Sequence, residues 1–492
     1  MMIKMADKQH TWEKKNCIRQ IVLWATLLLC TAIMISLCFD EGIDLDEAYS
    51  YRTVHGNTLG GIVHKIIEAH DTDIPLWYCA LRVWTWIFGE SWFSYKLSVV
   101  LGNVATMLLG ATVIRKNWGY WTAILFMIPA SLSPALLRVG VNVRMYAWTV
   151  FLVTACALIA YELIKAPGKP KLWFLLFLTT LSALFCHYFT AFCHLFIYLY
   201  LLLELWKYDR KHVWKVFTSG IASIVPFFIW LLVSDFFHLT KSAGDTRPMQ
   251  FRFDVEEFLY FMFYTNKITY GLLFGAILCL MAVIALIYHW KKFGKGEGGF
   301  VLLCLGMFFA TYTMASLMAS ISVHFFTPRH IMHAVSLMWL GIAIVLPRIN
   351  ISVTVSYLLY LAALSWGSYE MSYAVEYTTT PYLEETKEFI AENIHPGDII
   401  IYNSEPGFDL LYGCYMPEQE YIYFPELTDI QALAGKRVWF LLCKEEFFTE
   451  EEQEMYGITY RKEGHYGFQI IGDCTDFDLL RVEVEGCSGM KY

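Results

Sequence analysis

The sequence has few charged residues for its length. Charged side chains make up 17% of the 492 residues and hydrophobic ones 57%, whereas a soluble protein typically has about 25% charged residues. This shortage argues against a soluble globular protein. The segment from Ile21 to Phe39 holds no charged residue, and it is long enough to cross a bilayer core of about 30 Å as a helix. We therefore predict an integral membrane protein that lies in the lipid bilayer and has no nucleic-acid partner.

Several signals of other protein classes are missing. No small-residue cleavage site follows the first apolar segment, which ends in Phe39-Asp40-Glu41, so we expect a retained signal anchor. The thirteen cysteines show no CxxC or other metal-ligand spacing. Transporters tend to have internal repeats and charged or broken helices at the membrane midplane, but this sequence has no visible repeat and almost no charge in the centres of its apolar segments. These absences argue against a transporter or flippase of lipid-linked saccharides, which would work without catalysis. We keep that class as the alternative to an enzyme.

Apolar segments fill the chain as far as Trp366. Besides the first, we predict helical spans at 95–113, 119–137, 146–164, 171–186, 188–206, 213–235, 268–289, 299–320, 329–347 and 350–367. They make a polytopic α-helical membrane protein of about 11 spans, with 75–89 as a short candidate for a twelfth. Lys and Arg gather in loops that all fall on one side of the membrane, which indicates the cytoplasmic side. We expect a multi-pass cell-membrane protein with a cytoplasmic N-terminus.

Charge divides the chain into two parts. From residue 370 onward the net charge is −17, and the remainder carries +9 of the total of −8. Such a step predicts a domain boundary, with a membrane domain at 1–369 that carries the first outer loop, 40–74. The other part, 370–492, is predicted to be an acidic, soluble, extracytoplasmic α/β domain. Its expected elements are a helix and three apolar β-rich runs, at Tyr382–Asn393, Asp398–Tyr402, Arg437–Cys443 and Phe468–Ile471.

Two groups of acidic residues lie in the first outer loop. Asp44, Asp46 and Glu47 follow the first span, where crowded like charges raise one another's pKa. Glycosyl transfer needs a carboxylate in such a place to take the proton of the acceptor hydroxyl, although a solvated acidic loop is an alternative. Asp71 and Asp73 precede the proline of HDTDIPLWY, which starts an apolar segment and places both acids at the interface. A helix cap would explain Asp73 better than Asp71.

Cationic and aromatic residues occur at other predicted outer turns. Arg144 and Tyr146 stand in NVRMY, His187 and Tyr188 lie between two apolar segments, and Arg329 opens another. Arginine binds phosphate through two parallel hydrogen bonds. An arginine beside a tyrosine can equally be an interfacial anchor, and a single interfacial histidine is more often structural than catalytic.

In their order, the motifs DEAYS, HDTDIPLWY, NVRMY and HYFTAF resemble those of the bacterial branch of the protein O-mannosyltransferase group. That group belongs to the multi-span glycosyltransferases of the C-type fold (GT-C) and includes the aminoarabinose transferases that modify lipid A. The resemblance covers roughly residues 20–350. It implies an undecaprenyl- or other polyprenyl-phosphate sugar donor and transfer on the outer face to a glycan, lipid or protein acceptor.

The resemblance also implies site residues. The acidic pair of the family's first loop falls on Asp46 and Glu47, with Asp46 as the catalytic base. The family's second acidic position falls on Asp71, and the sequence departs from the pattern where the usual His and first Pro are Asp73 and Ile74.

The family's outer-turn Arg and Tyr fall on Arg144 and Tyr146, and its His-Tyr pair falls on His187 and Tyr188. We therefore expect an inverting transferase in which Arg144 or Arg329 holds the donor phosphate. Glu47 or Asp71 would orient the acceptor or the donor. Some enzymes of this fold use a divalent metal ion and others do not, and no ligand spacing here decides between the two.

Overall fold

The computed structural model describes most of the membrane-embedded part and the centre of the C-terminal part. The described residues are 2–40, 42–68, 74–234, 280, 283–284, 286–287, 290–321, 328–348, 388, 390–402, 408–423, 426, 437–442, 458–470 and 473–484. The predicted span 350–367 and nearly all of 268–289 lie outside them. The chain divides into two compact units, one of residues 1–39 and 56–374 and one of residues 40–55 and 375–492.

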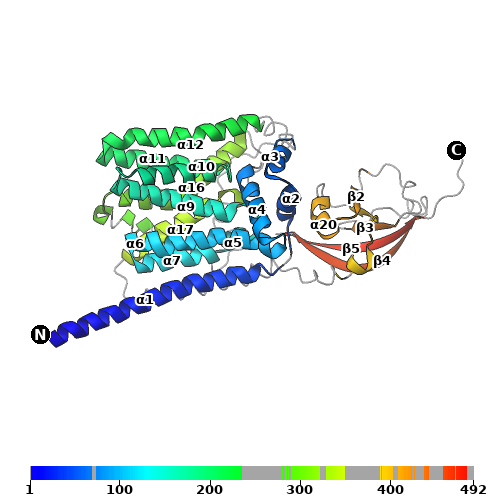
Figure 1. The fold of residues 1–492 in the computed structure, drawn as a ribbon, viewed down its shortest axis with the longest axis horizontal. Coiled ribbons are helices and arrows are strands. Elements are labelled where there is room, and N and C mark those ends of the chain that lie inside the picture. The colour runs from blue at the N-terminus through cyan, green and yellow to red at the C-terminus, as the bar shows by residue number, and fades with distance from the viewer. Residues whose placement is uncertain are drawn as a thin grey trace. The chain divides into compact units, whose positions relative to one another are not determined.

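The first unit is a bundle of helices (Figure 1). Its longer helices are α1 (Met2–Leu37), α5 (Trp92–Leu109), α7 (Tyr120–Leu132), α9 (Tyr146–Lys165), α10 (Pro170–Leu184), α11 (Thr190–Tyr208), α12 (Val213–Val233), α16 (Glu297–Ile321) and α17 (Met332–Val345). Shorter elements connect them: α3 (Leu59–Glu68), α4 (Pro75–Phe88), η1 (Gly110–Ile114), α6 (Arg115–Trp118), α8 (Pro134–Val141), η2 (Arg210–His212), η4 (Trp290–Lys292), η5 (Pro328–Ile331) and η6 (Leu346–Arg348). Seven helices among the described residues are long and apolar enough to cross a membrane. The prediction of a multi-pass helical membrane protein is confirmed.

Two predicted segments differ from the spans expected. The segment 119–137 is not one helix, because α7 ends at Leu132 and α8 begins at Pro134. Ser133 between them has extended backbone, with φ −65° and ψ 145°, because a residue before proline is disfavoured in the helical region. The candidate span 75–89 forms α4, whose 14 residues extend about 21 Å at 1.5 Å per residue. That length is too short for a bilayer core of about 30 Å.

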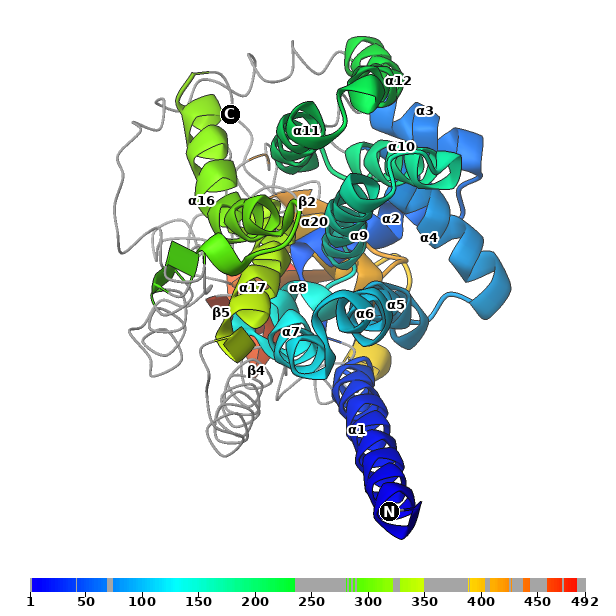
Figure 2. The same ribbon diagram turned by 90° about the vertical axis from the view of Figure 1, so that its left-hand side faces the viewer.

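Helix α17 forms the centre of the bundle. It packs against α7, α9 and α16 (Figure 2), and its side chains are almost all buried. The Thr154 and Ser336 hydroxyls join α9 to α17 by a buried hydrogen bond of 2.9 Å. Helices α5 and α9 approach closely at Gly102, where a Cβ atom would come within 2.9 Å of the carbonyl carbon of Ala147. These contacts hold α5, α9 and α17 against one another, and the starts of α9 and α17 carry Tyr146 and His333.

One end of the bundle is held together by polar contacts. Glu297 accepts a hydrogen bond from Trp118 Nε1 at 2.7 Å and forms an ion pair with Arg348. Lys165 Nζ donates to Asn117 Oδ1 at 2.5 Å. These contacts bring the ends of α6, α9, α16 and η6 together, and with them the loops in which Lys and Arg gather. The side of the membrane that this end faces stays a prediction.

The second unit is a small α/β structure. Its five-stranded sheet has the order β2-β1-β3-β5-β4, with β1 (Ile399–Tyr402) parallel to β2 (Glu420–Tyr423) and β3 (Val438–Leu442). The long strands β4 (Ile458–Ile470) and β5 (Asp473–Val484) form an antiparallel pair, and β5 pairs with β3. The sequence predicted β1, β3 and the end of β4, but neither β2 nor β5. The predicted helix Tyr382–Asn393 lies largely outside the described residues.

Among the described residues of the second unit, two helices pack against each other, and one of them comes from the first outer loop. Helix α2 (Leu45–Val54) packs against α20 (Phe408–Tyr415). An ion pair of 3.8 Å between Arg52 and Asp409 links the two helices. The acidic motif after the first span therefore folds with the C-terminal part of the chain, a pairing that the sequence analysis did not foresee.

Candidate functional site

A cluster of cationic and aromatic side chains lies at one end of the first unit. The α8–α9 turn supplies Tyr146, the α10–α11 turn supplies His187, and η5 and the start of α17 supply His330 and His333. The ring centroid of His187 is 5.6 Å from that of Tyr146, 5.5 Å from His330 and 6.1 Å from His333. Tyr188 stacks on His187 at 5.0 Å. Tyr146 and His187, predicted from two separate turns, thus lie beside His330 and His333, which were not predicted.

Arg144 of the same cluster is buried and not extended to the membrane surface. Its side chain is only 8% exposed, and its Nη1 donates a hydrogen bond of 2.8 Å to the hydroxyl of Tyr78, which is fully buried. Tyr78 belongs to α4, which begins at Pro75 in the first helical position after the extended residue Ile74. Because a buried guanidinium is costly unless it is paired, this geometry does not fit a surface anchor.

His187 is a neutral imidazole at neutral pH. Burial holds its pKa well below the usual value, and the neighbouring His330 and His333 and the charges of Arg144 and Arg329 lower it further. Its Nδ1 finds no hydrogen-bond partner among the described residues. The backbone is fixed by the start of α11, where the Thr190 hydroxyl donates to the His187 carbonyl at 2.7 Å. A neutral imidazole has one donor and one acceptor nitrogen, so the ring can donate a hydrogen bond to an anion.

The acidic residues of α2 take different positions in the second unit. Asp44 and Glu47 form a capping box, in which Asp44 Oδ1 accepts from the Glu47 N–H at 2.7 Å and Glu47 Oε2 accepts from the Asp44 N–H at 3.0 Å. Both side chains are buried, whereas Asp46 is half-buried and takes no part in the box. Two of the three carboxylates thus have a structural explanation in the capping box.

Among the remaining predicted residues, Asp71 and Asp73 lie outside the described residues, and Arg329 lies in η5 next to His330. Sequence reasoning did not pick out Tyr78, although Tyr78 stands inside the quoted motif, one helical turn after Pro75. No group of three His, Cys, Asp or Glu that could hold a metal ion occurs in the described part of the chain.

No protein-family model and no curated protein matches the sequence. Solved structures do match. ArnT from Cupriavidus metallidurans bound to undecaprenyl phosphate matches with a TM-score of 0.60 at 11% identity, over 96% of this chain and 99% of that one. The apo state of ArnT matches with a TM-score of 0.58 at the same identity and coverage. The apo form of the Archaeoglobus fulgidus oligosaccharyltransferase matches at 0.51 and 10% identity, over 81% of this chain and 64% of that one.

The likeness to ArnT extends over nearly the whole of both chains, so it includes the multi-span bundle and the C-terminal part. The chain therefore has the C-type fold of the GT-C membrane glycosyltransferases, as the order of its motifs predicted. At such low identity the likeness shows the fold alone. A proposal about function therefore depends on the residues of the cluster.

Proposed function

We propose that the protein is an integral membrane glycosyltransferase that moves a sugar from a polyprenyl-phosphate donor to an acceptor on the outer face of the membrane. The observation that supports this most strongly is the cluster of buried Arg144 and His187 with half-buried Arg329 at one end of the bundle. It occurs in a fold like that of ArnT, which was solved with undecaprenyl phosphate bound.

The cluster has the chemistry that a donor phosphate needs. In the transfer step the bond between the anomeric carbon and the phosphate oxygen breaks, and its electron pair leaves with the phosphate. Arg144 and Arg329 supply two fixed positive charges, and such charges stabilise a leaving anion most strongly where water is excluded. His187 adds a further hydrogen-bond donor. Tyr78, bonded to Arg144 at 2.8 Å, holds the guanidinium in place and is a positioning residue.

Asp46 is proposed as the general base. Its carboxylate would accept the proton of the acceptor hydroxyl as the hydroxyl oxygen attacks the anomeric carbon from the side opposite the phosphate, which inverts the configuration there. The capping box supports this choice, because it gives Asp44 and Glu47 a structural function. Asp71 stays an expectation for orienting the substrates. Among the described residues no set of ligands for a divalent ion occurs.

The test is a transfer assay with the purified full chain in liposomes. Polyprenyl-phosphate sugars with a radiolabelled sugar are supplied together with membrane lipids, glycans and proteins as acceptors. We expect the label to move covalently to an acceptor and the free polyprenyl phosphate to accumulate in equal amount. A flippase would instead move the intact donor across the bilayer with no release of polyprenyl phosphate, and that result would overturn the proposal.

A further inference from the structure

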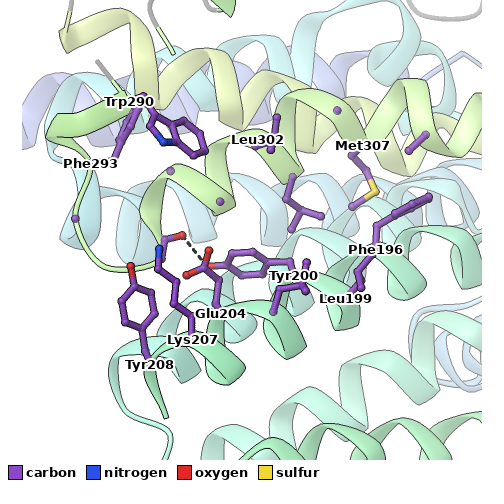
Figure 3. Close-up of a pocket in the computed structure, with 18 residues that line it drawn as sticks. Phe196, Leu199, Tyr200, Glu204, Lys207, Tyr208, Trp290, Phe293, Leu302 and Met307 are labelled. Carbon is purple, nitrogen blue, oxygen red and sulfur yellow. Dashed lines mark hydrogen bonds between the residues drawn. The ribbon is translucent and has the colours of Figure 1, made fainter. Parts of the chain in front are cut away.

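A hollow lies at the opposite end of α11 from His187. It is a cavity of about 490 Å³ between the C-terminal half of α11 and the N-terminal half of α16. Figure 3 shows that its polar side chains, Glu204, Lys207 and Tyr208, gather at one end, whereas Phe196 and Met307 lie at the other. The cavity is therefore polar at the end of the bundle and apolar toward the middle of the membrane. That distribution matches a lipid with its head group at the polar end.

Glycine residues at the start of α16 create the space. Gly296 has a positive φ of 72° and its carbonyl accepts a hydrogen bond of 3.0 Å from the Tyr200 hydroxyl. At Gly299 a Cβ atom would collide with Oε1 of Glu204. Any larger residue at position 299 would displace this carboxylate, so the glycine allows Glu204 to lie against α16.

Glu204 is incompletely satisfied by the described part of the protein. Its Oε2 atom is buried and has no hydrogen-bond partner among the described residues. A buried polar atom without a partner is costly, and more so when it carries charge. A ligand with a cationic N–H group at this point would remove that cost.

Two positive charges lie near the same end of the cavity. Lys207 is one helical turn from Glu204, and its Nζ is 4.7 Å from the ring centroid of Tyr208. Lys295 Nζ is 5.2 Å from the same ring, so one tyrosine positions both ammonium groups. The mouth of the cavity thus offers cations for a phosphate and, deeper, a carboxylate for an amine.

We propose that this cavity binds a phospholipid whose head group carries a primary ammonium, as in phosphatidylethanolamine. The phosphate lies between Lys207 and Lys295, and the ethanolamine arm folds back from it so that the ammonium donates to Glu204. An acyl chain follows Leu199 and Phe196 into the membrane. This site is separate from the proposed donor site, and it stands whether or not the protein transfers sugars.

The test measures lipid binding to the purified full chain by native mass spectrometry. Phosphatidylethanolamine, phosphatidylglycerol and phosphatidylcholine with identical acyl chains are titrated in parallel. Phosphatidylglycerol has no amine, and the trimethylammonium of phosphatidylcholine cannot donate a hydrogen bond. We expect phosphatidylethanolamine to bind roughly tenfold more tightly than either, which corresponds to about 1.4 kcal/mol. Equal binding of the three lipids to the wild type would overturn the proposal.

Variants locate the site. Glu204→Gln should abolish the preference for phosphatidylethanolamine, and Gly299→Ala, which displaces the same carboxylate, should do so independently if the first variant is unstable. Glu162→Gln is the matched control, because Glu162 lies in the last turn of α9, outside the cavity, and should keep the preference. A preference that survives both Glu204→Gln and Gly299→Ala contradicts the proposal.

A last comparison separates a lipid from a soluble ligand. Glycerophosphoethanolamine has the same head group without acyl chains, so it should compete with phosphatidylethanolamine only weakly. Competition as strong as that of the whole lipid would show that the cavity binds a small amine phosphate, and the lipid assignment would be wrong.

Discussion

The three carboxylates of residues 44–47 should respond to substitution in different ways. Asp44 and Glu47 exchange hydrogen bonds of 2.7 and 3.0 Å with each other's backbone N–H groups and are 5% and 3% exposed. Loss of a helix cap costs about 0.5–2 kcal/mol. Asp44→Ala should therefore lower the thermal stability of the purified protein, with activity falling only in proportion to unfolding. Asp44→Asn should preserve both, because asparagine caps a helix about as well as aspartate.

Asp46→Asn should show the opposite pattern. Asp46 takes no part in the capping box, so an isosteric amide should leave that box and the stability that it provides intact. The amide cannot accept the acceptor's proton, and general-base catalysis contributes about 10²–10⁴-fold to rate. We expect a loss of turnover of at least this size with donor binding retained. The assay compares melting temperature, donor binding and sugar transfer for each variant in the same membranes at matched expression.

The comparison of Asp44→Asn with Asp46→Asn decides the assignment, because the two variants remove the same charge two residues apart. If Asp44→Asn abolishes transfer and Asp46→Asn does not, the catalytic base is Asp44 and not Asp46. If neither variant affects transfer by a folded protein, the catalytic base lies elsewhere in the chain.

Three further predictions concern other residues. Arg144→Lys should weaken donor binding while the protein still accumulates, because lysine lacks the planar fork; unchanged affinity would refute it. Tyr78→Phe removes the acceptor of a buried charged hydrogen bond and should lower the free energy of unfolding by about 1.5–3 kcal/mol. Chemical denaturation measures this loss, with the Arg144→Lys variant compared in parallel. The C-terminal unit should react with a membrane-impermeant thiol reagent in intact cells at an engineered Glu418→Cys. Native Cys414 is a poor reporter, because burial raises its pKa to about 12 and a thiol reacts as the thiolate. Labelling of Glu418→Cys only after cell lysis would contradict the predicted topology.

Much of the helical architecture could be predicted because long apolar segments have few alternatives in a membrane. The predicted segment 188–206 became α11, Thr190–Tyr208, and 146–164 became α9, Tyr146–Lys165. The clustering of His187 with residues of two other turns was also predictable. Turns separated by an even number of spans return to the same side of the membrane, where polar side chains can meet.

Other features depend on tertiary contacts that no local pattern contains. The hydrogen bond between Tyr78 and Arg144 joins residues 66 positions apart, and the pairing of α2 with α20 joins segments from opposite ends of the chain.

The break at Ser133-Pro134 was visible in the sequence, but an average over an apolar window conceals a single proline. The capping box was also visible as Asp44 and Glu47, three residues apart, and was interpreted as part of a catalytic acidic group.

The neutral state of His187 leads to a final prediction about donor binding. In the free protein, burial and the nearby Arg144 and Arg329 hold its pKa well below the usual value, so the ring is uncharged at pH 7. A phosphodiester donor carries a fixed negative charge, and an anion bound beside the imidazole favours its protonated form. Donor binding should therefore raise the pKa of His187 and take up a proton.

By linkage, the affinity for donor then increases as pH falls between the pKa of the free protein and that of the complex. The limit is about tenfold per pH unit, because one proton is bound. His187→Asn retains a hydrogen-bond donor but cannot titrate, so its affinity should be independent of pH. The measurement is equilibrium binding of a polyprenyl-phosphate sugar at pH 7.5, 6.5 and 5.5 for wild type and variant. An equal slope in the two proteins would mean that His187 does not take up a proton when the donor binds.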